Sequence, residues 1–361
     1  MRAKILTVVG ARPQFIKAAA VTRAIEKHPH ITEVMVHTGQ HFDEAMSAIF
    51  FAELGIPEPR YNLAVHGGGH GEMTGRMLIA LEPVMRAERP DAVLVYGDTN
   101  STLAGALTAS KLQIPVFHVE AGLRSYNRRM PEEINRVITD HLSSLLLCPT
   151  TNAVANLTRE GIVTGVHNVG DVMYDATLHV RATALKSSTI LDRLNLGSRP
   201  YVVLTLHRAE NTDNPGRLAE LLSFVEQQSG DADIIFPVHP RTRRALAPGS
   251  GLSPRFRLVE PLGYVDMHRL VAGASLIMTD SGGLQKEAYF HRVPCITLRE
   301  ETEWVETVAA GWNRLWSQPA YRPRREIAEY GDGNAAGAIV AAMCTALLSV
   351  RAETDDGPRS K

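Results

Sequence analysis

Short, nearly continuous apolar runs alternate with helical patterns along most of this chain. Runs without strict alternation of apolar and polar residues are typical of strands buried on both faces of a parallel sheet. In the first half we expect strands at 5–9, 33–37, 91–96, 115–119 and 145–148. We expect helices there at 15–27, 43–53, 71–89, 99–112 and 131–141. This alternation predicts an α/β fold whose strands run parallel.

A second series of strands follows a weaker stretch between residues 165 and 200. We expect its strands at 201–206, 233–237, 256–259, 276–279 and 294–298. With 361 residues, the chain is long enough for about two domains. We therefore expect two doubly wound, Rossmann-like domains, residues 1–170 and 171–332, that face each other across a cleft. The last helix, about residues 333–350, is a candidate to pack back on the first domain.

The balance of charge excludes several classes of partner. Lys and Arg total 38 against 39 for Asp and Glu, so nothing indicates a nucleic-acid-binding surface. No apolar stretch approaches the roughly 20 residues of a transmembrane helix. The apolar run after Met1 is short and ends at Gly10-Ala-Arg-Pro, which favours a first strand over a signal peptide. We expect a cytoplasmic protein with no nucleic-acid or membrane partner.

The cysteines Cys148, Cys295 and Cys344 are far apart and odd in number. We expect them to be small core residues of a protein in a reducing compartment. No pair of His or Cys residues has the spacing of a metal-ligand motif, so no metal site is expected.

The loop after the first strand, Gly10-Ala-Arg-Pro-Gln-Phe-Ile-Lys17, lacks the Gly-x-Gly-x-x-Gly pattern, so it does not predict a dinucleotide site. It places Arg12 and Lys17 at the start of a helix, where anions bind readily. The competing interpretation is a solvated basic pair without a ligand.

Three carboxylates stand close together in the sequence, each where a strand ends or a helix begins. Asp98 and Glu120 follow expected strands, and Glu132 opens an expected helix. Structural explanations compete with a functional one: Asp98 is a possible helix cap, and either Glu132 or Glu133 is an ordinary acid of a helix start. Glu120 has a weaker structural explanation, because Glu is not a usual residue of caps or turns. Carboxylates gathered at one site push their pKa values apart, which separates a general acid from a general base.

A second motif, Asp280-Ser-Gly-Gly-Leu-Gln-Lys-Glu287, follows an expected strand and opens a helix. Its glycines let the backbone approach a ligand, and the Ser281 hydroxyl with the free N–H groups of the helix start can hold a phosphate. Glu287, about two helical turns further on, is placed to accept hydrogen bonds from ribose hydroxyls. His207 and His239 end two more strands, and we interpret them as exposed site residues.

Together these motifs resemble those of the non-hydrolysing UDP-N-acetylglucosamine 2-epimerase family over nearly the whole chain. The resemblance is carried by Tyr96-Gly-Asp-Thr, Val119-Glu-Ala-Gly-Leu-Arg124, Pro131-Glu-Glu-Ile-Asn-Arg136, His207-Arg and Asp280-Ser-Gly-Gly-Leu-Gln. It implies the two-domain glycosyltransferase-B-type fold, a homodimer, and no nicotinamide or metal cofactor. It also implies the inversion of C2 in UDP-N-acetylglucosamine, which gives UDP-N-acetylmannosamine. In that reaction UDP leaves as the C2 proton is removed, and it adds back to the glycal with a proton on the other face.

The resemblance also implies roles for individual residues of this chain. The implied catalytic residues are Asp98, Glu120, Glu132 and His207. The implied residues that bind the UDP-sugar substrate are Arg12, Lys17, Arg136, Met267, Ser281, Gly282, Gly283 and Glu287. To these we add His239, because it lies at the end of an expected strand.

One segment departs from the family pattern. Glu300-Glu-Thr-Glu-Trp-Val-Glu306 stands where the best-known bacterial members carry a Thr-Glu-Arg-Pro-Glu sequence. The segment resembles a branch that includes epimerases of UDP-2,3-diacetamido-2,3-dideoxy-glucuronic acid, which is therefore a second candidate substrate. Three further activities compete with epimerisation: a UDP-sugar glycosyltransferase of the same fold, a hydrolysing relative and a non-catalytic UDP-sugar sensor.

Overall fold

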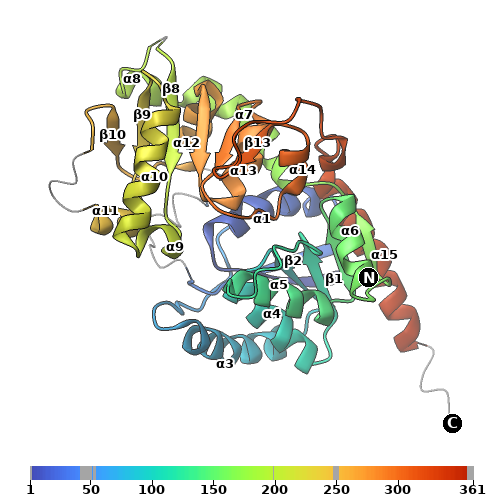
Figure 1. The fold of residues 1–361 in the computed structure, drawn as a ribbon. Helices are drawn as coiled ribbons and strands as arrows, with labels where there is room; N and C mark the ends of the chain where they lie inside the picture. Colours follow the sequence, from blue (N-terminus) through green and yellow to red (C-terminus); the bar gives the residue numbers. More distant parts are fainter. Residues whose placement is uncertain (1, 41–50, 52–53, 198, 247–251, 356–361) are drawn as a thin grey trace. The chain divides into compact units, whose positions relative to one another are not determined.

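The computed structural model describes residues 2–40, 51, 54–197, 199–246 and 252–355 (Figure 1). The chain divides into two compact units: unit 1 is Met1–Ala176 with Ala328–Lys361, and unit 2 is Thr177–Ile327. The domain boundary expected at residue 170 falls inside unit 1. The final helix, α15 (Ala335–Asp355), belongs to unit 1 and packs against α1 (Arg12–Ile25).

Unit 1 is built on a parallel sheet of seven strands. Their order across the sheet is β3 (Tyr61–Asn62), β2 (Ile31–His37), β1 (Ala3–Val9), β4 (Ala92–Tyr96), β5 (Val116–Val119), β6 (Leu145–Cys148) and β7 (Val166–Asn168). Every residue of β4 and β5 is buried, as expected for a sheet covered on both faces. The order of the strands reverses between β1 and β4, because the chain builds outward from β1 on one side and from β4 on the other.

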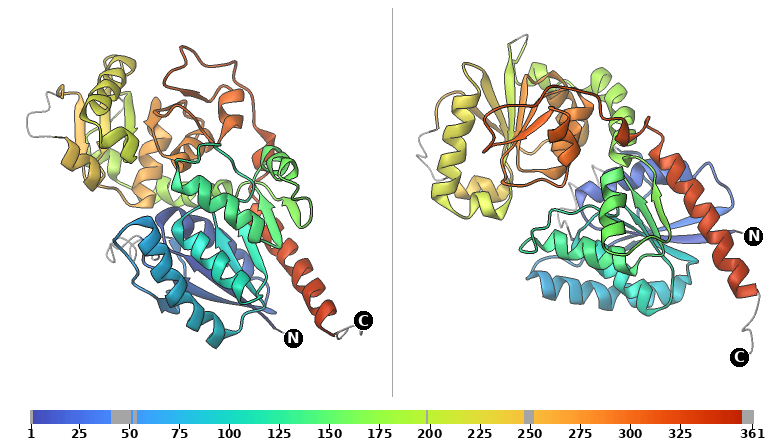
Figure 2. Two further views of the ribbon diagram at one scale, coloured as in Figure 1. Left: turned by 60° about the horizontal axis from the view of Figure 1, so that its bottom comes forward. Right: turned by 45° about the vertical axis from the view of Figure 1, so that its right-hand side comes forward.

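Helices connect these strands and cover the sheet. Besides α1 and α15 they are α3 (His70–Glu88), α4 (Asn100–Lys111), α5 (Pro131–Leu142), α6 (Thr151–Arg159) and α7 (Val172–Ser187), which continues into unit 2. Val8 and Val95 of the sheet pack in one core cluster with Met77 and Leu81 of α3. Figure 2 shows α3, α4 and α5 as neighbours in this layer. The helix expected at 43–53 lies outside the described residues apart from residue 51.

Unit 2 contains a second parallel sheet, of six strands. Their order is β10 (Phe256–Val259), β9 (Asp233–Pro237), β8 (Tyr201–Thr205), β11 (Leu276–Thr279), β12 (Cys295–Thr297) and β13 (Asn313–Leu315). The helices of this unit are α8 (Ile190–Arg193), α9 (Ala209–Thr212), α10 (Pro215–Gln228), α11 (Pro240–Ala245), α12 (Tyr264–Gly273), α13 (Gly282–Phe290) and α14 (Val305–Ala309). Here the order of the strands reverses between β8 and β11.

Alternate residues of β8 belong to two separate hydrophobic clusters. Val202 and Leu204 pack with the apolar face of α10, whereas Tyr201 and Val203 pack with residues of α12 and α13. Because successive side chains of a strand point to opposite faces, both faces of this sheet are covered by helices. The two cores explain why the sequence of this strand is apolar almost throughout.

The predicted fold class is confirmed, since two parallel sheets with flanking helices are observed. The strands expected at 233–237, 256–259 and 276–279 coincide with β9, β10 and β11. Strands β3 and β13 were not expected from the sequence. Both are edge strands of two or three residues, and so short a run carries little apolar signal.

The loop between α6 and β7 contains two glycines with positive φ, Gly161 (+80°) and Gly165 (+70°). A Cβ at Gly161 would have nothing within 4 Å, whereas a Cβ at Gly165 would collide with the backbone carbonyl of Ser144. We expect Gly161→Ala to lower the free energy of unfolding by about 1–2 kcal/mol, the cost of a left-handed residue. We expect Gly165→Ala to cost clearly more, because it adds a backbone clash. Chemical denaturation of both variants checks this, and equal losses would contradict it.

Candidate active site

The residues expected to act gather where each strand order reverses. In open parallel α/β sheets, ligands bind at the carboxyl ends of the strands at such a reversal. In unit 1, Arg12 and Lys17 follow β1, and Asp98 follows β4. In unit 2, His207 follows β8, and Ser281 follows β11. The fold therefore exposes these side chains at the edge of each sheet where a ligand site is expected.

Gln14, buried in α1, joins the two loops at the reversal in unit 1. Its Oε1 accepts hydrogen bonds from the backbone N–H groups of Gly10 (2.8 Å) and Ala11 (3.0 Å). Its Nε2 donates to the Tyr96 carbonyl (2.9 Å) and to Thr102 Oγ1 (2.9 Å). A single amide thus fixes the loop after β1 against the loop after β4. Sequence reasoning missed this residue, whose signal is a polar side chain on the buried face of a helix.

Glu120 lies at the end of β5 with a φ of +71°, a region that non-glycine residues seldom adopt. Its buried carboxylate forms an ion pair with Lys17 Nζ, which is buried as well. A Cβ at Gly97 would lie 3.2 Å from Glu120 Oε2 and 3.3 Å from Lys17 Nζ. Only a glycine there lets the loop that carries Asp98 pass directly beside this ion pair.

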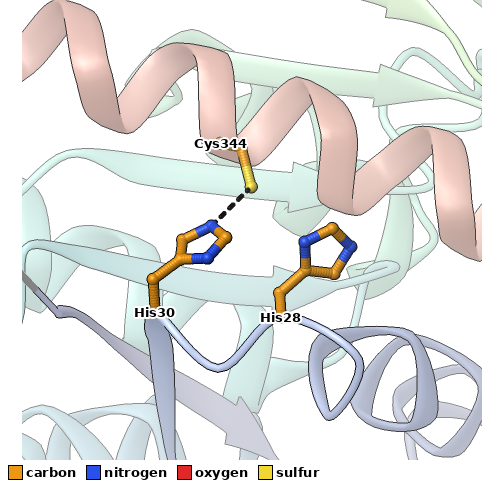
Figure 3. A group of neighbouring side chains, drawn as sticks. All are labelled: His28, His30 and Cys344. Carbon is orange, nitrogen blue, oxygen red and sulfur yellow. Dashed lines mark hydrogen bonds between the residues drawn. The ribbon is translucent and has the colours of Figure 1, made fainter.

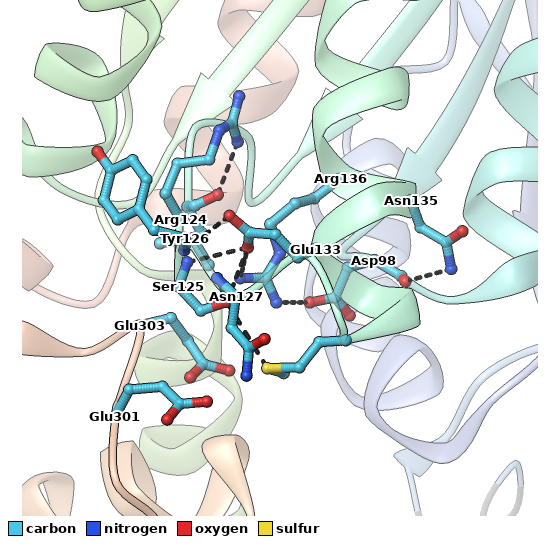
Figure 4. A network of polar contacts seen from close by, with 12 residues as sticks. Asp98, Arg124, Ser125, Tyr126, Asn127, Glu133, Asn135, Arg136, Glu301 and Glu303 are labelled. Carbon is cyan, nitrogen blue, oxygen red and sulfur yellow. Dashed lines mark hydrogen bonds and ion pairs between the residues drawn. The ribbon is translucent and has the colours of Figure 1, made fainter.

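The Asp98 carboxylate is paired with a second buried cation. This carboxylate pairs with the guanidinium of Arg136, which is buried on α5, and the Asp98 backbone carbonyl accepts a hydrogen bond from Asn135 Nδ2 (2.9 Å; Figure 4). The N-cap of α4 is Thr99, whose hydroxyl accepts a hydrogen bond from the N–H of Thr102. The helix-cap interpretation of Asp98 is therefore wrong. Its side chain is 30% exposed, so one face of the carboxylate remains open to solvent or ligand.

The two acids at the start of α5 differ sharply. Glu133 is buried and accepts hydrogen bonds from the N–H (2.9 Å) and Oγ (3.0 Å) of Ser125 and from the N–H of Tyr126 (2.9 Å; Figure 4). It also forms an ion pair with Arg136 (3.1 Å). Glu132 is half-buried, and its side chain makes no hydrogen bond or ion pair with the residues that the structure describes. The structural role thus falls to Glu133, which leaves the Glu132 carboxylate for a ligand.

A fully buried histidine, His118, supports the loop after β4. His118 donates from Nε2 to the Gly97 carbonyl (2.7 Å) and from Nδ1 to Asp140 Oδ1 (2.7 Å). Burial alone would raise the pKa of Asp140, but His118 and Arg124 hold it below its usual value. Sequence reasoning missed this network, although a histidine inside an otherwise apolar strand was a visible signal.

In unit 2, the buried carboxylate of Asp280 organises the site. It accepts hydrogen bonds from the backbone N–H groups of His207 (3.0 Å) and Arg208 (2.9 Å) and from Asn211 Nδ2 (3.1 Å). Burial would raise the pKa of Asp280, but its interactions with His207 and these donors lower it to about 2. His207 Nδ1 lies 3.0 Å from the carboxylate, and its side chain is 41% exposed. Asp280 therefore orients the ring and leaves Nε2 as the atom that can meet a ligand.

The first turn of α13 is unusually open. Ser281 is its N-cap, and its hydroxyl accepts a hydrogen bond from the N–H of Leu284 (3.5 Å). A Cβ at Gly282 would lie 3.2 Å from Glu303 Oε1, whereas a Cβ at Gly283 would meet nothing within 4 Å. Small residues at a helix start leave its N–H groups accessible, and such groups bind phosphate.

Three more predicted residues lie in unit 2. His239 is exposed, caps α11 by accepting from the N–H of Arg241 (3.2 Å), and has its ring centroid 6.0 Å from that of His207. Partial burial and the positive charges of His207 and Arg241 lower its pKa. Met267 is half-buried and packs against the core formed with α12 and α13. Glu287 is buried on α13, with Oε1 3.6 Å from His268 Nε2.

Two sets of predicted residues are thus brought together. Unit 1 assembles Lys17, Asp98, Glu120 and Arg136, with Glu132 on the same helix as Arg136 and Arg12 half-buried at the first residue of α1. Unit 2 assembles His207, His239 and the Ser281–Gly283 turn around Asp280.

Cys148 and Cys295 are buried as expected, but the expectation for Cys344 is wrong, because this residue is only half-buried on the surface helix α15.

Comparisons with known proteins agree with this architecture. A family model described as UDP-N-acetylglucosamine 2-epimerase matches residues 23–344. A UDP-N-acetylglucosamine 2-epimerase homolog of Methanococcus maripaludis is 50% identical over 93% of this chain and 98% of its own length. The UDP-2,3-diacetamido-2,3-dideoxy-D-glucuronate 2-epimerase of Pseudomonas aeruginosa is 51% identical over 86% of this chain and 88% of its own.

A solved structure is also similar to this chain. The UDP-GlcNAc 2-epimerase of Methanocaldococcus jannaschii, in complex with UDP-GlcNAc and UDP, superposes with a TM-score of 0.86 at 43% identity, covering 96% of this chain and all of that one (100%). Two doubly wound parallel sheets, each with a candidate site at its reversal of strand order, define a protein of the glycosyltransferase-B-like fold. Within that class, the chain belongs to the UDP-N-acetylglucosamine 2-epimerase family.

Among the described residues, no helix combines the length and the apolar character required to cross a bilayer.

The contrast between the two neighbouring acids of α5 is testable. We expect Glu133→Gln to lower the free energy of unfolding by roughly 3–5 kcal/mol, because it leaves the buried Arg136 charge without one of its partners. We expect Glu132→Gln to change it by no more than about 0.5 kcal/mol, as for a surface position. Urea unfolding of both variants measures the difference. Similar stabilities for the two would show that Glu133 is not the structural acid.

Proposed function

We propose that this protein is a non-hydrolysing UDP-N-acetylglucosamine 2-epimerase, which interconverts UDP-N-acetylglucosamine and UDP-N-acetylmannosamine. One observation carries the proposal: Asp98 and Glu120 lie on adjacent loops, and each is held by a buried cation of its own. Inversion at C2 needs a proton removed from one face and a proton delivered to the other. Two separately positioned carboxylates fit this need, and Glu132 adds a third without a structural partner among the described residues.

The reaction balances without an external cofactor. A carboxylate takes the C2 proton while the C1–O bond breaks, and the electron pair of that bond leaves with UDP. A double bond forms between C1 and C2, which makes the sugar a glycal. In the reverse sense UDP adds to C1 while a carboxylic acid delivers a proton to the opposite face of C2. The buried cations Lys17 and Arg136 keep Glu120 and Asp98 in place through both steps.

Unit 2 supplies groups suited to the departing UDP. The open first turn of α13 offers backbone N–H groups to a diphosphate, and His207, oriented by Asp280, can place positive charge beside it. Glu287 is proposed to accept from ribose hydroxyls, and Met267 to lie near the uracil. The homodimer implied by the resemblance and the cytoplasmic location expected from the sequence stay predictions.

A second candidate substrate is UDP-2,3-diacetamido-2,3-dideoxy-glucuronic acid. The Pseudomonas aeruginosa relative acts on the matching glucuronate nucleotide, as its name states. The segment 300–306, which departs from the common family pattern, contributes Glu303 and Trp304 beside Gly282, since a Cβ there would lie 3.2 Å and 3.5 Å from their side chains. This segment therefore lies next to the proposed diphosphate-binding turn, where it can influence which sugar is accepted.

Incubation with each sugar nucleotide in deuterated water tests the proposal. We expect deuterium at C2 of both epimers of UDP-N-acetylglucosamine by NMR and mass spectrometry, because proton removal and return exchange the C2 hydrogen with solvent. Asp98→Asn and Glu120→Gln should each slow this exchange by roughly 10²–10⁴-fold, the usual weight of a general acid or base.

Different outcomes of this incubation would assign a different function. Exchange only with the diacetamido glucuronate nucleotide would assign that substrate instead. Free N-acetylmannosamine with UDP would indicate a hydrolase. UDP-sugar binding without any exchange would contradict the epimerase assignment and leave a glycosyltransferase or a sensor.

The open turn of α13 gives a second test. We expect Gly283→Ala to leave the stability of the free protein almost unchanged, because its Cβ would meet nothing within 4 Å, yet to weaken UDP binding at least about tenfold by blocking the diphosphate. Gly75→Ala on α3 is the matched control, since a Cβ there would also meet nothing within 4 Å. Calorimetric titration with UDP compares the two, and equal affinities would remove α13 from the diphosphate site.

A further inference from the structure

Three potential metal ligands meet on the surface of unit 1, away from the candidate active site. His28 and His30 flank Pro29 in the turn after α1, and Cys344 reaches them from α15 (Figure 3). One ligand atom from each residue lies within 4.8 Å of the other two, and His30 Nε2 is 3.7 Å from Cys344 Sγ. His28 and Cys344 are half-buried and His30 is exposed, so a metal ion can enter from solvent.

The framework around this cluster is already rigid. The His28 N–H donates to the Ile25 carbonyl (2.7 Å), and the His28 carbonyl accepts from Ile31 (2.9 Å). The His30 carbonyl accepts from the N–H of Ala3 (2.7 Å), which ties the turn to β1. On the other side, α15 packs along α1. Side-chain rotation alone has to bring the three ligand atoms together.

We propose that His28, His30 and Cys344 bind a Zn²⁺ ion that fastens α15 to the turn between α1 and β2. Two imidazole nitrogens and one thiolate suit zinc rather than Mg²⁺ or Ca²⁺, which take oxygen ligands. Zinc bonds of ~2.0–2.1 Å to nitrogen and ~2.3 Å to sulfur put neighbouring ligand atoms of a tetrahedron about 3.3–3.6 Å apart. The separation of 3.7 Å between His30 and Cys344 is already close to these values, and the other two, at most 4.8 Å, have to shorten by about 1.5 Å at most. Water takes the fourth position.

Binding replaces the thiol proton of Cys344 with a zinc–sulfur bond, and the proton is released to solvent. Because the proton and the metal ion compete for the thiolate, zinc affinity should rise with pH. The cluster lies at the amino end of β2, whereas the candidate catalytic residues lie at the carboxyl ends of β1, β4 and β5. β1 separates these edges by about 20 Å, at ~3.3 Å per residue over seven residues. The ion is therefore structural, and it takes no part in the epimerase chemistry.

Cobalt(II) is the probe, because it occupies zinc sites and a thiolate ligand gives it an intense charge-transfer absorption. Titration of the reduced full-length protein should give this band at about one Co²⁺ per chain, and Zn²⁺ should abolish it by displacement. Zn²⁺ should also raise the thermal unfolding midpoint, since it binds only the folded site. Cys344→Ser should remove the band, and His30→Gln should weaken zinc binding at least about tenfold.

His167→Gln is the matched control, because His167 is an exposed histidine on β7 of the same unit. This variant should bind cobalt and zinc as the unaltered protein does. Cys148 and Cys295 are fully buried, so they should contribute no band. An unaltered protein without the charge-transfer band, or a band that survives Cys344→Ser, would overturn the proposal.

Discussion

The buried ion pair between Lys17 and Glu120 is the interaction on which the candidate site of unit 1 depends. A carboxylate buried without a counter-charge would be costly to ionise, and a lysine from the neighbouring helix offsets that cost. The pair also requires an uncommon backbone conformation at Glu120 and a glycine at position 97, which together let the next loop approach. Gln14 and His118 hold the loop after β4 in place beside this ion pair through hydrogen bonds to its backbone carbonyls. The placement of Asp98 and Glu120 in this unit thus rests on the packing of buried polar groups.

Unit 2 also contains a buried carboxylate, but different groups stabilise its charge. Its buried carboxylate, Asp280, stays ionised because backbone N–H groups and a histidine surround it at the reversal of strand order. Asp280 is too enclosed to meet a substrate, so it serves to orient His207 and the loop after β8. In unit 1 the carboxylates of Asp98 and Glu120 are themselves the groups proposed for proton transfer. Asp280 of unit 2 thus positions other side chains, whereas Asp98 of unit 1 keeps a partly exposed carboxylate.

The parallel strands and the exposed motif residues could be predicted because their signals are local. A strand buried on both faces is apolar throughout, and residues after its carboxyl end reach a ligand site. The division of labour between Glu132 and Glu133 could not be predicted, because both carry the same helix-start signal and only the contacts with Ser125 and Tyr126 separate them. The cap of α4 was ambiguous for the same reason. The proximity of His30 and Cys344 could not be predicted, since the two residues are 314 positions apart in the chain.

Unit 2 is continuous in sequence, whereas unit 1 is made of the first 176 residues and the last segment from Ala328. During synthesis, unit 2 can complete its two cores once residue 327 has left the ribosome, since a domain folds as a unit when all of it is available. Synthesis of unit 1 begins first, but this unit completes its fold last. The exposed side of α1 is covered only once α15 has been synthesised. Until then the nascent chain presents an incomplete apolar face, so the order of translation makes the final helix the step that closes the fold.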